Sequence, residues 1–233
     1  MKRGGNIFYM IERGVVLSAG YSKRLRPLSF FIPKPLIKIK GKPIIIHIFD
    51  NLKNLGVKKI YVNLYYKKDK IEKIIKNSEY KDIIFIFKEK ELMGTGGGVK
   101  NFEKYIEGNF ILHNCDIYHK LDLNEFVDFH FKNSKIGTLL LTFMETKSEV
   151  VLEGNLVKDI KIHKRKNKFL TYAGISIFKK EIFRFIPEGK SDLLDVFFEL
   201  IKYKELAGFK VKEGLIFDIG SFKTLFNLYL RNY

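Results

Sequence analysis

Short apolar runs alternate with amphipathic stretches through the first half of the chain. Runs of this length between polar or glycine-containing segments are typical of buried strands, which we expect at residues 14–17, 59–63, 83–87 and 109–113. Apolar residues at helical spacing, with Pro43 at the first start, predict helices at 44–52, 69–76 and 99–105. Strands that alternate with helices favour parallel pairing through right-handed crossovers.

The second half of the chain shows a different pattern. After an expected helix at 123–131 and a buried strand at 137–143, apolar runs bracket the pair Gly154-Asn155, which is typical of a hairpin. A basic segment, 163–168, is predicted to be a loop, with a lid or a partner-binding role as the alternative. We then expect the following elements: a strand at 169–178, a helix at 191–202, short strands at 208–211 and 214–217, and a last helix ending at Asn232.

Length and composition limit the possible classes of protein. The 233 residues suffice for one domain, expected at 13–233 after a short extension at 1–12. No apolar run could span a membrane, no secretory signal is visible, and the single cysteine, Cys115, fits a cytoplasmic location. The formal charge of +17 is scattered and often paired with glutamate, without a nucleic-acid-binding motif, so neither nucleic acid nor a membrane is an expected partner.

One loop carries the strongest chemical signal. Behind the first strand the chain reads LSAGYSKRLRPLS, residues 17–29, followed by PKPL at 33–36. Small residues let backbone N–H groups approach an anion, Arg24 can bind phosphate through a planar fork, and Lys34 through a compact charge. A strand that leads into such a loop predicts a polyphosphate site.

Two further segments could face the same ligand. Four glycines in five positions, within Gly94–Gly98, make a surface that another molecule or a base could approach closely. Asp116 directly follows the strand at 109–113, and ligands lie beyond the carboxyl ends of such strands. A carboxylate facing phosphates there could hold a divalent cation.

These motifs resemble the signature of the sugar-phosphate nucleotidylyltransferases, L-A-A-G-x-G-x-R-L-x-P-L-T followed by P-K-P-L. Ser18 and Ser22 depart from it, and serine at 22 is tolerable if its φ is negative or if its hydroxyl binds phosphate. The segments TGGG, NCD and FDIGS also resemble family motifs, and the resemblance covers about residues 13–230. It is greatest to the short mannose or heptose 1-phosphate guanylyltransferases and N-acetylmuramate 1-phosphate uridylyltransferases.

The resemblance implies a fold, a reaction and a set of site residues. The fold would be α/β: a single Rossmann-like, three-layer domain of the nucleotide-diphospho-sugar transferase type, with a mixed, mostly parallel sheet and a β-hairpin subdomain on the sugar side. The reaction would join an NTP and a sugar 1-phosphate into an NDP-sugar and pyrophosphate, with Mg²⁺ as cofactor, in a monomer or homodimer. The expected residues are Arg24, Lys34 and Asp116 for catalysis; Leu17, Ala19, Gly20, Tyr21, Ser22, Arg24, Thr95, Gly96 and Gly97 for the nucleotide; Asn114, Glu153 and Gly174 for the sugar; and Asp116 and Asp218 for the metal.

The sequence leaves the base and two rival functions open. The chain has no glutamine, the residue with which many family members read the base. Glu89 or Glu91 could accept the N–H groups of guanine, whereas backbone groups alone could read uracil, so GTP and UTP both remain, with CTP third. A metal-dependent glycosyltransferase using an NDP-sugar and a non-catalytic nucleotide-binding protein are the alternatives.

Overall fold

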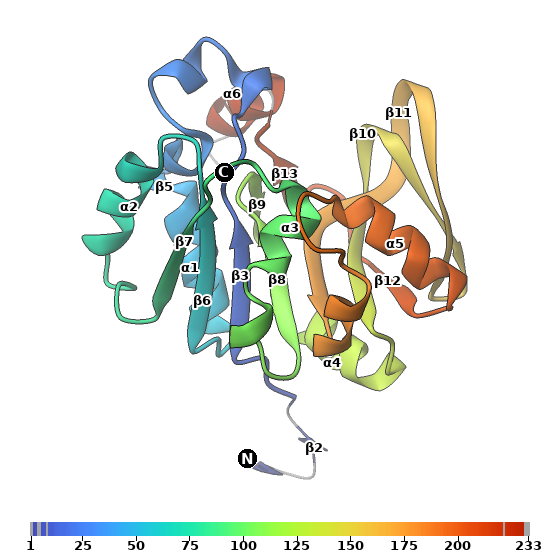
Figure 1. The fold of residues 1–233 in the computed structure, drawn as a ribbon. Coiled ribbons are helices and arrows are strands. Elements are labelled where there is room, and N and C mark those ends of the chain that lie inside the picture. Colours follow the sequence, from blue (N-terminus) through green and yellow to red (C-terminus); the bar gives the residue numbers. More distant parts are fainter. Residues whose placement is uncertain (1, 4–5, 8, 221, 231–233) are drawn as a thin grey trace.

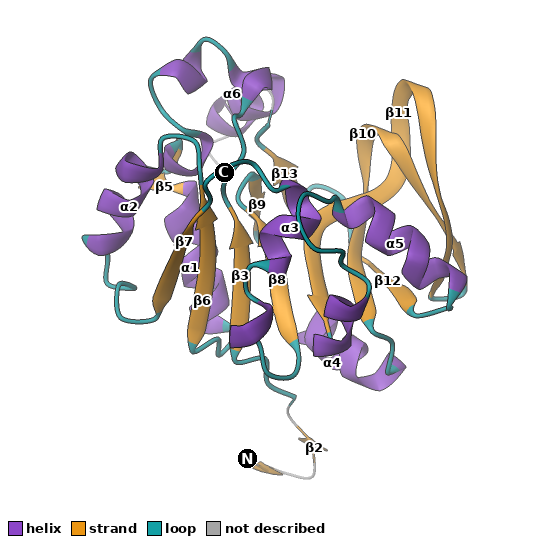
Figure 2. Cartoon of the chain, viewed as in Figure 1, coloured by secondary structure: helices purple, strands orange, loops and turns teal. Residues whose placement is uncertain are grey.

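A seven-stranded sheet in the order β10-β12-β11-β8-β3-β6-β7 forms the centre of the computed structural model (Figure 1). The structure describes residues 2–3, 6–7, 9–220 and 222–230. Figure 2 shows helices on both faces of this sheet, with α3 and α5 on one face and α1 and α4 on the other. The expected three-layer α/β architecture is therefore confirmed.

The parallel half of the sheet follows the alternating pattern of the first half of the chain. Strand β3 pairs in parallel with β6 and β8, and β6 pairs in parallel with β7. Helix α3 begins at the glycines themselves, five residues before the expected start. Its first turn packs closely against other residues, and glycine is favoured there because it has no side chain. The elements are β3 (Arg13–Leu17), α1 (Ile44–Asn54), β6 (Lys59–Leu64), α2 (Lys68–Lys76), β7 (Ile84–Lys88), α3 (Gly94–Lys100) and β8 (Phe110–Asn114).

The second half adds antiparallel strands and a long hairpin arm. Strands β10 and β11 pair about the predicted Gly154-Asn155 turn, and β11 also runs antiparallel to β8. The basic segment 163–168 is not a separate loop: it lies within β11, where the register passes from Ser148↔Ile162 to Thr146↔Asn167 and leaves extra residues on β11. The elements are α4 (Asn124–Asn133), β10 (Gly137–Glu153), β11 (Leu156–Phe178), α5 (Leu193–Lys202) and β12 (Leu206–Lys210).

Several small elements complete the molecule. Strand β9 (Ile117–His119) pairs antiparallel with β13 (Ile216–Asp218), and α6 (Phe222–Leu230) follows; the expected helix end at Asn232 lies outside the described residues. Short pairs are β1 (Lys2–Arg3) with β2 (Asn6–Ile7), and β4 (Lys38–Ile39) with β5 (Lys42–Pro43). Among the described residues, no helix is long and apolar enough to cross a membrane.

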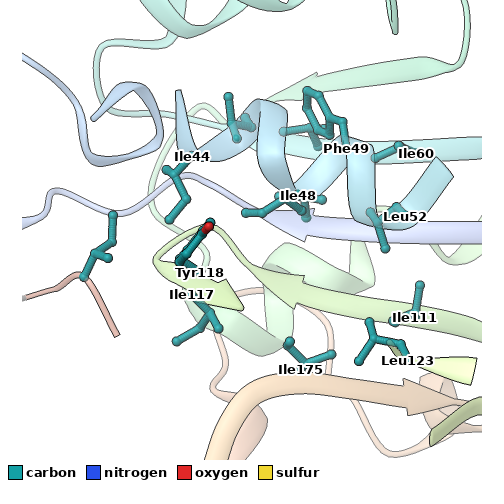
Figure 3. Packing of buried hydrophobic residues seen from close by; sticks show 14 of the residues in the cluster. Ile44, Ile48, Phe49, Leu52, Ile60, Ile111, Ile117, Tyr118, Leu123 and Ile175 are labelled. Carbon is teal, nitrogen blue, oxygen red and sulfur yellow. The ribbon is translucent and has the colours of Figure 1, made fainter. Parts of the chain in front are cut away.

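Successive side chains of a strand point to opposite faces of the sheet, and both faces are buried here, which explains why the central strands are unbroken apolar runs in the sequence. In β3, Val16 packs into one core while Val15 and Leu17 pack into the other, on the opposite face of the sheet. The first core holds the buried side of α1, with Ile44, Ile48, Phe49 and Leu52 (Figure 3). Ile11 is also buried in this core, so the end of the expected extension packs against the domain.

Three buried histidines are held neutral inside the fold. His113, His119 and His130 are each at most 3% exposed. Burial lowers the pKa of His113 and of His130 to about 4, and that of His119 to about 3. The Nδ1 atom of His130 lies 2.7 Å from Thr138 Oγ1, and Nδ1–H of His113 donates to the Asn114 carbonyl at 2.8 Å.

These histidines predict a loss of stability at mildly acidic pH. Their folded pKa values lie below the unfolded value of about 6.5, so the unfolded chain binds more protons as pH falls through the interval from about 6.5 to about 4. We expect the free energy of unfolding, measured with urea, to fall by on the order of 1 kcal/mol per pH unit for each histidine in that interval. His130→Gln should flatten this slope. An unchanged slope in the variant would show that other groups cause the acid sensitivity.

Candidate active site

The loop after β3 is built as a series of tight turns. Three 3-10 helices, η1 (Lys23–Leu25), η2 (Leu28–Phe30) and η3 (Lys34–Leu36), carry the chain from the sheet edge towards α1. Leu25 is fully buried and anchors the loop, whereas a Cβ added at Gly20 would meet nothing within 4 Å. The backbone at Gly20 is therefore open to a ligand.

Ser22 adopts a conformation that the sequence analysis did not expect. Its φ is +56°, in the left-handed region, so the first of the two conditions under which serine would be tolerable here is not met. The residue precedes η1, and its carbonyl accepts the N–H of Leu25 at 3.0 Å, which requires the chain to reverse at this point. Glycine, the residue of the family signature, takes this conformation without the cost that a side chain adds. Contact of its hydroxyl with phosphate stays a prediction.

Four charged side chains meet at the edge of the sheet. Lys34 Nζ donates to Asp116 Oδ2 at 2.8 Å, and Arg24 Nη1 lies 4.0 Å from Asp218 Oδ2. The pairing of β9 with β13 brings the two acids together: Asp218 lies opposite Ile117, and the Ile219 N–H donates to the Asp116 carbonyl at 2.9 Å. The structure thus brings together Arg24, Lys34, Asp116 and Asp218, as expected from the sequence.

The charges of this cluster act strongly on one another because the site is partly buried. Burial alone would lower the pKa of Lys34, but the Asp116 carboxylate, with help from Cys115 and Asp218, raises it above its ordinary value. Burial raises the pKa of Asp218, and the negative charge of Asp116 adds to the effect. Lys34 is therefore held as an ammonium, and the two carboxylates repel each other.

The two carboxylates suit a hard cation only in combination with a ligand. No group of three or more His, Cys, Asp or Glu side chains could hold a metal ion within the described part of the chain. Mg²⁺ commonly binds through one or two carboxylates, with substrate phosphates and water as the other donors. Asp116 and Asp218 fit that donor set, and a shared cation would relieve the repulsion that raises the pKa of Asp218.

A cavity of about 600 Å³ opens beside these charges and reaches the hairpin arm. Gly174 forms part of its wall with φ +77°, and a Cβ there would lie 2.7 Å from Ile117 Cγ1 and 3.1 Å from Asn114 Nδ2, so only glycine fits. Its wall includes Arg24, Asn114, Asp116, Met144, Glu145, Thr146, Lys166, Thr171, Tyr172, Gly174, Asp218 and Thr224.

The arm contributes different residues from those expected. The structure places Glu153 outside this cavity, at the end of β10, where its carboxylate is 71% exposed and lies 2.6 Å from Lys158 Nζ. The hairpin turn packs against β12, with the Gly208 N–H donating to the Asn155 carbonyl, so Glu153 cannot face the sugar side. Lys166 reaches the cavity instead. The sequence analysis marked the basic segment 163–168 but not that Lys166 lines the cavity.

The glycine-rich segment has a packing role that the sequence did not reveal. The N–H groups of Gly96 and Gly97 both donate to the Ser191 carbonyl, at 2.8 and 3.3 Å. A Cβ added at Gly94 would lie 2.3 Å from that same oxygen. Thr95 Oγ1 accepts the Leu193 N–H at 2.8 Å. These glycines therefore join α3 to the start of α5, and their contact with a base stays a prediction.

A chain of buried hydrogen bonds joins the loop after β3 to the loop before α3. Asn63 Oδ1 accepts the Ser18 N–H at 2.7 Å, and Asn63 Nδ2 donates to Glu89 Oε1 at 2.7 Å. Glu89 Oε2 accepts the Met93 N–H at 3.3 Å, and Glu89 is only 2% exposed. Both oxygens of Glu89 thus accept protein donors, so it offers no free edge for a base, whereas Glu91 is exposed.

Solved structures share this architecture. HddC from Yersinia pseudotuberculosis, solved in complex with GMP-PN, aligns with a TM-score of 0.78 and 26% identity, over 96% of this chain and 100% of that chain. The chain therefore shares its α/β fold with a protein that was solved in complex with GMP-PN.

The sequence comparisons name the family. A model described as nucleotidyl transferase matches residues 13–231, and the chain belongs to this family, which confirms the resemblance drawn from the loop motifs. The bifunctional protein GlmU of Methanocaldococcus jannaschii is 34% identical over 88% of this chain and 50% of the relative. The mannose-1-phosphate guanyltransferase of Saccharomyces cerevisiae is 28% identical over 94% of this chain and 65% of the relative. The chain thus spans about half to two thirds of the length of these relatives.

The buried chain through Asn63 and Glu89 predicts unequal effects of two matched substitutions. Glu89→Gln should lower the free energy of unfolding by about 1–3 kcal/mol, because the new amide N–H₂ faces either Asn63 Nδ2 or the Met93 N–H, both donors. Glu91→Gln, on the exposed part of the same loop, should leave it unchanged. The free energy of unfolding of both variants is measured by urea denaturation. Equal midpoints would show that the Glu89 carboxylate does not join the loops.

Proposed function

We propose that this protein transfers a nucleotidyl group from an NTP to a sugar 1-phosphate and releases pyrophosphate. The observation that carries the proposal is the cluster of Lys34, Asp116, Arg24 and Asp218 at the carboxyl edge of the parallel strands, beside a cavity closed by Gly174. Membership of the nucleotidyl transferase family supports it. A glycosyltransferase would have no evident use for a loop with both Arg24 and Lys34.

The reaction requires charge neutralisation more than covalent help. An oxygen of the sugar phosphate attacks the α-phosphorus, the bond from that phosphorus to the bridging oxygen breaks, and pyrophosphate leaves with the electron pair. Lys34, already held as an ammonium, would offset the negative charges of the α-phosphate and the sugar phosphate as they approach. Arg24, with the open backbone around Gly20, would hold the β- and γ-phosphates.

Asp116 and Asp218 would hold Mg²⁺ against the phosphates. When bound, the cation would polarise the α-phosphate and offset the charge that develops there. Its binding would also draw the two carboxylates into one shared interaction, which removes the repulsion between them. Lys34 would then lose part of its hold on Asp116 and could turn towards the phosphates.

Guanine is the base that the observations favour. The structure of HddC from Yersinia pseudotuberculosis contains GMP-PN, and the yeast relative is named a mannose-1-phosphate guanyltransferase. Glu91 is the exposed carboxylate that could accept the N–H groups of guanine. Uracil is the second candidate, because the buried oxygens of Glu89 remove one carboxylate reader and leave the backbone as the alternative.

A matrix of substrates tests the reaction and the base together. GTP, UTP, CTP and dTTP are each combined with hexose and N-acylhexosamine 1-phosphates in the presence of Mg²⁺, and released pyrophosphate is measured. We expect GTP to give the highest rate and mass spectrometry to detect the NDP-sugar. Pyrophosphate from no combination would overturn the proposal, and cleavage of an NDP-sugar without NTP would favour a glycosyltransferase.

The metal assignment predicts the effect of removing either carboxylate charge. Asp116→Asn and Asp218→Asn should each lower kcat by at least about 100-fold, because an amide binds Mg²⁺ weakly. The melting temperatures of both variants, and circular dichroism, check that the fold is retained. Asp122→Asn, on an exposed loop outside the cluster, is the matched control and should keep full activity. Full activity in both variants, or activity that persists in excess EDTA, would contradict the assignment.

A further inference from the structure

A second, smaller hollow adjoins the site on the side of helix α5. It has a volume of about 190 Å³ and lies between α5 and the hairpin arm, which run side by side in Figure 1. Its walls are mainly apolar: Ile160 and Tyr172 come from β11, and Leu193, Leu194 and Phe197 from α5. Ile160, Leu193 and Phe197 are each at most 5% exposed, so these walls are fixed by the core behind them.

The hollow shares part of its wall with the larger cavity. Asn114 and Tyr172 line both of them, and Asn114 stands at the end of β8, two residues before Asp116. A sugar phosphate bound near Asp116 and Gly174 would therefore extend one of its substituents towards α5. Tyr172 separates the two spaces and packs edge-on against Phe197, with ring centroids 5.4 Å apart.

Polar groups at the apolar walls already have partners. The Tyr172 hydroxyl lies 3.0 Å from Ser176 Oγ, and Thr95 Oγ1 accepts the Leu193 N–H at 2.8 Å. A sugar hydroxyl pushed between these walls would lose water without gaining a partner, which is costly. Asn114 and Ser148 line the same hollow and can exchange hydrogen bonds with an amide.

We infer that this hollow receives the acylamino substituent of an N-acylated hexosamine 1-phosphate, with its amide against Asn114 and Ser148 and its methyl group between Leu193, Leu194 and Phe197. The inference rests on the proposed function and names the substrate class for that same site. It explains why a pocket beside a phosphate cluster is lined by leucine and phenylalanine, whereas an unsubstituted sugar presents hydroxyl groups that need polar partners.

Two measurements test this assignment. With the best NTP, kcat/KM is compared for N-acetylglucosamine 1-phosphate against glucose 1-phosphate, and for N-acetylgalactosamine 1-phosphate against galactose 1-phosphate. We expect the acylated member of at least one pair to be favoured by roughly tenfold or more. If no sugar 1-phosphate releases pyrophosphate, the proposed function fails; if the unsubstituted sugars are used equally well or better, that function stands and this inference is overturned.

Substitutions inside and outside the hollow test whether the hollow causes the preference for the acylated sugar. Leu194→Trp should fill the hollow and reduce the preference for the acylated sugar by at least about tenfold, as should Ser148→Leu from the opposite wall. Asp195→Trp adds the same bulk one residue further along α5, outside the hollow, and should leave the preference unchanged. An unchanged preference in both filling variants would overturn the assignment of this hollow, even if acylated sugars are favoured.

Discussion

The ion pair between Lys34 and Asp116 is the interaction around which the site is arranged. An ammonium as buried as that of Lys34 is tolerable only beside a negative charge, and Asp116 supplies one at 2.8 Å. A second carboxylate, Asp218, is then forced into the same environment and is itself penalised by burial. The two carboxylates are therefore held close together in a partly buried place, which is an arrangement expected of a site that binds phosphates together with a cation.

The backbone fixes this arrangement through the sheet. Strands β3 and β8 run side by side, and the Cys115 N–H donates to the Leu17 carbonyl at 3.1 Å, so the phosphate loop and Asp116 leave the sheet at the same level. Antiparallel β11 follows β8 and brings Gly174 next to Asn114. Three neighbouring strands thus bring to one edge the residues that we propose to bind phosphate, metal and sugar, in keeping with the position of ligand sites in open α/β sheets.

Sequence patterns predicted the parts of this structure that local chemistry determines. The apolar runs located β3, β6, β7 and β8 to within a residue, because strands buried on both faces contain few polar residues. The loop motif identified Arg24 and Lys34, and the segments NCD and FDIGS identified Asp116 and Asp218; the structure shows that the four cluster. Features that depend on tertiary contacts could not be predicted from the sequence. Glu153 was expected at the sugar, but the turn that carries it packs on β12. Lys166 lines the cavity within a part of β11 whose irregular register no residue type indicates. Likewise, Gly96 is adjacent to Ser191 only because α5 returns across the sheet.

The three-residue ladder between β9 and β13 has a consequence for how the protein is made. It joins segments about a hundred positions apart in the chain, and one of its members is Asp218. A nascent chain emerging from the ribosome can complete the parallel strands β3, β6, β7 and β8 and the phosphate loop early, since all of them lie before residue 115. It acquires its second acid only when residues 216–218 have been made and have paired with β9. A chain released before this segment would therefore keep the loop but lack the completed cluster of Arg24, Lys34, Asp116 and Asp218.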